Sequence, residues 1–93
     1  TQTTLTSVSL DENSTGGSPG NGGGLHITGA GSVTVNLGVV EDNDASNEGG
    51  GLWNSGTGTL SVVDTTIAGN IAPVGGGYFQ VAGGTSSLRN STV

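Results

Sequence analysis

The chain has 93 residues, of which 20 are glycine and only 30% are hydrophobic, and it contains no cysteine. Its formal net charge is −6, from seven acidic residues against one basic residue, Arg89. This balance gives no cationic patch for nucleic acid or an anionic lipid surface, and disulfides and thiolate metal sites are excluded. No apolar run is long enough for membrane insertion as a helix.

The first repeated feature along the chain is a hexapeptide that begins and ends with an apolar residue. It occurs as LTSVSL at 5–10, VNLGVV at 35–40, VVDTTI at 62–67 and LRNSTV at 88–93. The spacings between these starts are 30, 27 and 26 residues. Val33, Val35 and Leu37 are apolar at every second position, as are Leu60 and Val62, which is typical of a half-buried strand. The pattern predicts a strand at each hexapeptide.

An asparagine turn follows three of these segments, in the form of an apolar residue, two variable residues and then Asn13, Asn43 or Asn70. If equivalent positions stack, these asparagines form a ladder of side-chain hydrogen bonds. Six acids gather around the same turns: Asp11, Glu12, Glu41, Asp42, Asp44 and Glu48. We interpret them as a solvated acidic edge. A Ca²⁺ site is the alternative, although the spacing matches neither an EF-hand loop nor the glycine- and aspartate-rich calcium repeat.

A glycine triplet comes next in each unit. The triplets consist of Gly22, Gly23 and Gly24, then Gly49, Gly50 and Gly51, and then Gly75, Gly76 and Gly77. Glycine permits positive φ and close backbone approach, so we expect a sharp corner that is stacked in every unit. The STGGSPG segment at 14–20 lengthens the first unit and is expected to form a surface loop.

Each triplet leads into a short second strand. Leu25, Leu52 and Tyr78 share one phase, which we expect to point inward. His26, Trp53 and Phe79 share the opposite phase, so the pattern predicts an outward aromatic strip that could serve as a contact face for sugar rings or another protein.

Three markers that share one period indicate a repeat protein. Apolar spacing of two, together with turns of glycine and asparagine, favours an all-β, right-handed parallel β-helix with 26–27 residues per coil and three to three and a half coils. The predicted organisation is a single β-solenoid segment over 1–93. Its coils run over about 1–31, 32–58 and 59–84, followed by a partial coil at 85–93.

The alternation of apolar-x-x-Asn with Gly-Gly-small-apolar resembles the repeats of polymorphic outer-membrane proteins, which are surface autotransporters with FxxN and GGA[ILV] motifs. Here an aliphatic residue replaces the phenylalanine and a third glycine replaces the alanine. The resemblance covers nearly the whole chain. It implies a secreted, right-handed β-helical passenger or adhesin segment at the cell surface.

Neither end of the chain carries a distinct polar capping repeat, and residues 2–10 and 85–93 have the same phase. Open ends of this kind favour head-to-tail stacking of copies into an extracellular filament or surface fibre. The alternatives are an adhesin that uses the Trp53 face for glycans or a host surface protein, and, more remotely, ice binding by an outward ladder of Thr4, Thr34, Ser61 and Ser87.

We expect no enzymatic activity and no cofactor. His26 has no evident acid or nucleophile partner in the sequence pattern. Asp64 is predicted to be the only acid within a strand, where it could form a cross-coil salt bridge with Arg89 that contributes little if exposed.

Overall fold

The computed structural model describes residues 2–17 and 20–93, and within them all regular structure is β-strand. The first coil contains β1 (Gln2–Thr6), β2 (Ser9–Asp11), β3 (Ser14–Thr15) and β4 (Leu25–Ile27). The second contains β5 (Ser32–Asn36), β6 (Val39–Glu41), β7 (Asp44–Ala45) and β8 (Leu52–Asn54). The third contains β9 (Thr59–Val63), β10 (Thr66–Ala68) and β11 (Tyr78–Gln80), and β12 (Thr85–Arg89) begins the next coil.

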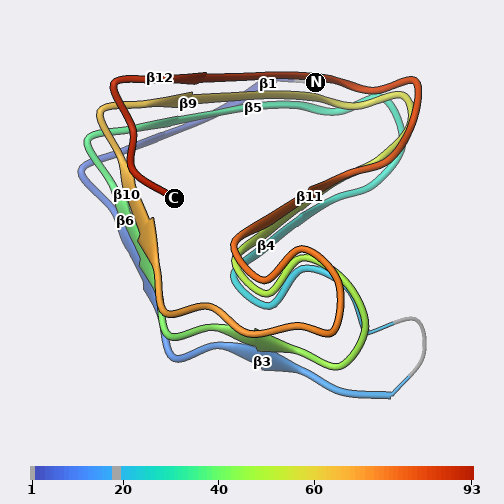
Figure 1. Ribbon diagram of the computed structural model, residues 1–93. Helices are drawn as coiled ribbons and strands as arrows, with labels where there is room; N and C mark the ends of the chain where they lie inside the picture. The colour runs from blue at the N-terminus through green and yellow to red at the C-terminus, as the bar shows by residue number, and fades with distance from the viewer. Residues whose placement is uncertain (1, 18–19) are drawn as a thin grey trace.

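Every strand pairs in parallel with its equivalent in the neighbouring coil (Figure 1). The sheets are β1-β5-β9-β12, β10-β6-β2, β11-β8-β4 and β3-β7. Gln2 pairs with Ser32, Ser32 with Thr59 and Thr59 with Thr85, so successive coils are offset by 30, 27 and 26 residues. The prediction of an all-β parallel solenoid of about three turns is therefore confirmed. Its right-handed winding stays a prediction.

The predicted single strand at each hexapeptide is wrong, because a corner divides it into two strands. Ser7, Leu37, Asp64 and Asn90 hold equivalent positions, and all four have a left-handed backbone with φ between 49° and 56°. This conformation turns the chain from the first sheet into the second. Leu37 thus lies in a corner rather than inside a strand, and 56% of it is exposed. Its apolar spacing with Val33 and Val35 misled the inward assignment.

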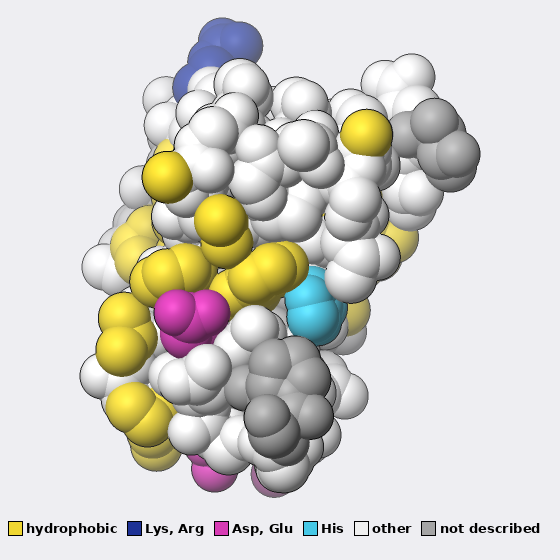
Figure 2. All heavy atoms as spheres, turned by 90° about the vertical axis from the view of Figure 1, so that its right-hand side faces the viewer, with side chains coloured by type: hydrophobic (Ala, Val, Ile, Leu, Met, Phe, Trp, Pro, Cys, Tyr) yellow, Lys and Arg dark blue, Asp and Glu magenta, His cyan; other side chains and the backbone are white. Residues whose placement is uncertain are grey.

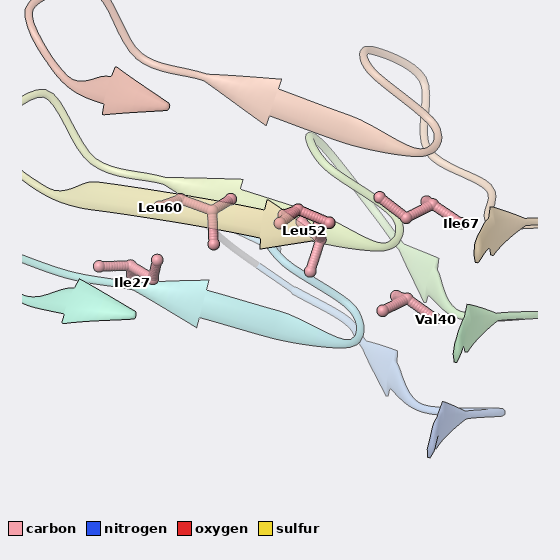
Figure 3. Close-up of a cluster of buried hydrophobic side chains, with 6 residues drawn as sticks. Ile27, Val40, Leu52, Leu60 and Ile67 are labelled. Carbon is pink, nitrogen blue, oxygen red and sulfur yellow. The ribbon is translucent and has the colours of Figure 1, made fainter. Parts of the chain in front are cut away.

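The core is a narrow layer of aliphatic side chains between the sheets (Figure 3). Ile27, Val40, Leu52, Leu60 and Ile67 point into this layer from successive coils, and Val62 completes the cluster. Each of these residues is at most 4% exposed. Inward residues alternate with outward ones along β9, as the pleat of a strand requires.

The predicted surface loop at 14–20 includes Ser18 and Pro19, which lie outside the described residues. Its first two residues form the short strand β3, and Gly17 has φ of 77°. Across residues 2–17 and 20–93, no helix meets the length and apolarity that crossing a membrane requires.

Candidate functional site

The three turn asparagines stack along the solenoid and form a directional ladder. Asn13 donates from its backbone N–H and its side-chain Nδ2 to Asn43 Oδ1, at 2.9 and 3.1 Å. Asn43 donates in the same way to Asn70 Oδ1, at 2.9 Å for both bonds. The Nδ2 atoms of Asn43 and Asn70 also reach the carbonyl oxygens of Leu10 and Val40, at 2.8 and 2.9 Å. Each asparagine therefore ties its own turn to the coils on both sides.

The glycine triplets also stack directly over one another. The N–H of Gly23 donates to the carbonyl of Gly49 at 3.1 Å, and the N–H of Gly50 donates to that of Gly75 at 3.2 Å. Only the first glycine of each triplet requires positive φ, with values of 69°, 64° and 60° at Gly22, Gly49 and Gly75. The sharp corner expected from the sequence is therefore made by the first glycine of each triplet.

The second and third glycines are needed for close approach instead. A Cβ atom on Gly50 would lie 2.5 Å from the carbonyl oxygens of both Gly76 and Ile71. A Cβ on Gly51 would lie 2.5 Å from the Gly77 carbonyl and 2.9 Å from Nδ2 of Asn70. Real Cβ atoms do not approach backbone oxygens this closely, so the triplet is the condition for packing the glycine corner against the asparagine ladder.

The aromatic residues form one outward column on the β4-β8-β11 sheet. His26 pairs with Trp53, and Trp53 pairs with Phe79, in the strand register. His26 is exposed, whereas Trp53 and Phe79 are half-buried. Figure 2 views the solenoid from this side, and the histidine lies beside hydrophobic side chains and an acidic one. We call these three residues the aromatic strip.

Two contacts fix the indole of Trp53. Its Nε1 donates to Oε1 of Glu48 at 3.1 Å. The rings of His26 and Trp53 meet edge to face, with centroids 4.4 Å apart and planes at 75°, the arrangement that aromatic quadrupoles favour. Glu48, which the sequence grouped with the acidic edge, thus acts as an orienting partner of the tryptophan.

The remaining acids do not assemble into an evident cation site. Asp11 pairs with Glu41 in the strand register, and Glu12 and Asp42 share a left-handed corner position. Among residues 2–17 and 20–93, no group of three or more acids and histidines is arranged to hold a metal ion. These carboxylates therefore supply negative charge to one side of the fold.

The prediction that Asp64 is the only acid within a strand is wrong. Asp64 follows β9 at a left-handed corner, while Asp11, Glu41 and Asp44 lie in strands. The contact between Asp64 and Arg89 is a backbone hydrogen bond, from the Asp64 N–H to the Arg89 carbonyl at 3.0 Å.

A second polar cluster, which the sequence did not indicate, lies at the inner end of the aromatic sheet. Asn54 is fully buried, and its Nδ2 donates to Gln80 Oε1 at 2.7 Å. Tyr78 donates its hydroxyl to the same Gln80 oxygen at 2.6 Å, and burial raises the pKa of Tyr78 above its ordinary value of 10.0. The equivalent residue one coil earlier is Ile27. No residue type recurs in this column, so the sequence carried no signal for it.

The outer face of the β1-β5-β9-β12 sheet is rich in hydroxyl groups. Thr4, Thr34, Ser61 and Ser87 share one column, as the register of the three strand pairs places them. The neighbouring column holds Thr6, Asn36, Val63 and Arg89, which interrupts the hydroxyl array with an apolar and a charged side chain.

Comparison of the chain with protein-family models, with curated proteins and with solved structures gave no match in any of the three.

Proposed function

We propose that the chain is a structural subunit of an extracellular filament or surface fibre, in which solenoids stack head to tail and continue the parallel sheets. The role is mechanical rather than enzymatic in this proposal. The similarity of the repeat to polymorphic outer-membrane proteins is consistent with a surface location and with a passenger or adhesin segment of that type.

The observation that carries the proposal is the direction of the asparagine ladder. At each step, the asparagine of the earlier coil donates two hydrogen bonds and that of the later coil accepts both. A ladder of this kind has an acceptor end at Asn13 and a donor end at Asn70. Ends of opposite character favour addition in one orientation, which is the condition for a polar, open-ended fibre.

The shape of the solenoid supports the same reading. Its Cα extents are 28 × 25 × 17 Å, and the shortest extent agrees with between three and four coils spaced by about 4.8 Å. The strands β1 and β12 each pair on one side only within the described residues, with β5 and β9 respectively. A further coil that pairs with either strand would lengthen the stack without changing its cross-section.

The position of β12 determines how two copies meet. Because β12 lies on β9, it occupies the place that β1 of a second copy would take if that copy's Asn13 continued the ladder on Asn70. A seamless junction therefore requires residues 85–93 to be displaced. Stacking of β1 on β12 instead leaves residues 69–84 without a covering strand at the junction.

The proposal is tested by electron microscopy, sedimentation and fibre diffraction of the purified 93-residue chain over a range of concentrations. We expect unbranched fibres that are close to the 28 Å extent in width at the level of the backbone, with an axial reflection at about 4.8 Å. A chain that ends at Gly84 should assemble faster, because nothing competes for the β9 edge. Monodisperse monomers of both chains at every concentration would refute the proposal, as would aggregates without the axial reflection.

A further inference from the structure

We propose that the aromatic strip of His26, Trp53 and Phe79 is a binding site for a neutral polysaccharide chain lying along the solenoid axis. The inference does not depend on fibre formation. It rests on how the rings are held, on what surrounds them, and on their spacing.

The rings are not needed to fill the fold. The tightest contacts at this column involve only the Cβ atoms. A Cβ on Gly49 would lie 3.0 Å from Trp53 Cβ, and a Cβ on Gly75 would lie 3.1 Å from Phe79 Cβ. The indole itself lies outside the buried core cluster. A side chain with a Cβ atom but no ring would therefore satisfy the glycine corner, and the ring leaves apolar surface half-exposed.

Trp53 is nevertheless held in place from two sides. Glu48 accepts the indole N–H at 3.1 Å, and His26 stands edge-on to the ring at a centroid distance of 4.4 Å. A side chain already fixed in one orientation loses less conformational entropy when a ligand stacks on it. The arrangement is that of a preorganised stacking surface.

The charge around the strip selects the kind of ligand. Glu48 is the charged residue that contacts Trp53, the chain carries a net charge of −6, and its one arginine lies on the β1-β5-β9-β12 sheet. Anionic polymers are therefore disfavoured. The neighbours of the strip are polar: Asn47 is exposed beside Glu48, and the second Glu48 carboxylate oxygen is available to accept a hydroxyl proton. A sugar ring has an apolar face and hydroxyl groups at its edge, which suits an aromatic floor with a polar rim.

The spacing favours a polymer over a single sugar. One ring stands on each coil, and parallel strands lie about 4.8 Å apart, which is close to the length of one pyranose unit in an extended chain. A polysaccharide parallel to the axis would meet successive rings with successive units. No enclosed pocket is formed by residues 2–17 and 20–93, so an open, extended ligand fits this face.

Because Trp53 is the only tryptophan in the chain, its fluorescence reports on the strip directly. We would titrate the chain with cello-, xylo- and manno-oligosaccharides of two to six units, and with anionic alginate oligosaccharides as a contrast. We expect a saturable change in Trp53 emission with at least one neutral series, tighter binding as the length grows to three units, and no response to alginate.

Affinity gel electrophoresis in the matching soluble polysaccharide then tests the residues. Trp53→Ala should weaken binding by about tenfold or more, in line with the loss of one aromatic stacking contact. Thr34→Ala, on the hydroxyl-rich sheet, should bind as the parent does. Phe79→Ala provides a second variant if Trp53→Ala fails to fold by circular dichroism. The proposal is overturned if no neutral saccharide perturbs Trp53, if Trp53→Ala binds as tightly as the parent, or if only an apolar dye or peptide binds.

Discussion

The asparagine ladder makes the sharpest prediction, at its central residue. Asn43 is 1% exposed, and its side chain takes part in four hydrogen bonds. It accepts two from Asn13 and donates one each to the Leu10 carbonyl and to Asn70 Oδ1. Asn43→Ala removes all four and leaves the Asn13 N–H and the Leu10 carbonyl without those partners.

The size of the effect follows from the number of bonds. A typical intramolecular hydrogen bond contributes about 1 kcal/mol net, and a buried group left unpaired costs more. The free energy of unfolding should therefore fall by about 4 kcal/mol in Asn43→Ala. This is a large share of the roughly 5–15 kcal/mol that stabilises an ordinary domain. In a chain of this length, the midpoint of thermal unfolding should drop by about 15–30 °C.

Asn13→Ala is the matched control, because it makes the same change at the exposed end of the ladder. The Asn13 side chain donates one hydrogen bond, to Asn43 Oδ1, so its loss should cost about 1 kcal/mol or less. Thermal and urea unfolding followed by circular dichroism would measure both variants. If the two variants differ by less than about 0.5 kcal/mol, the ladder does not hold the coils together in the way argued here.

Three further changes test other parts of the stack. Gly50→Ala should prevent stable folding, since its Cβ would lie 2.5 Å from two carbonyl oxygens, whereas Gly16→Ala, with nothing within 4 Å, should melt like the parent. Leu37→Asn should raise the free energy of unfolding by about 1 kcal/mol in urea titrations, because asparagine tolerates left-handed φ better than leucine. The raised pKa of Tyr78 means that the folded state holds the proton more tightly, so stability present below the ordinary value of 10.0 is lost as pH rises past it. Tyr78→Phe should reduce this alkaline loss between about pH 9 and about pH 11.

The period and the strand register could be predicted from the sequence because a solenoid obliges equivalent positions to stack. The spacing of the glycine triplets and of Asn13, Asn43 and Asn70 follows the same offsets as the strand pairing. Both features recur because their neighbours one coil away leave room for nothing else. A backbone oxygen excludes a Cβ at Gly50, and an amide must meet an amide at Asn43.

The corners could not be predicted, because the conformation recurs there while the residue type does not. Serine, leucine, aspartate and asparagine all adopt left-handed φ at the corner that follows the first sheet. These side chains face solvent, so the only shared requirement is on the backbone. Leu37 was misleading for this reason, since an apolar residue in strand-like spacing satisfied the pattern without being buried. The column of Ile27, Asn54 and Gln80 escaped detection on similar grounds.

The aromatic strip differs from both cases and gives a physical test of its purpose. Outward columns elsewhere change chemical class from coil to coil, as Thr6, Asn36, Val63 and Arg89 do, yet this column keeps a ring in every coil. If the rings were retained for packing, Trp53→Ala should destabilise the fold by about 3–5 kcal/mol, as loss of a core aromatic does. If they are retained for a ligand, the half-buried indole should contribute less than about 1.5 kcal/mol to stability while its removal abolishes binding. Urea unfolding of Trp53→Ala beside the binding titration separates the two, because packing and recognition predict opposite ratios of stability loss to affinity loss.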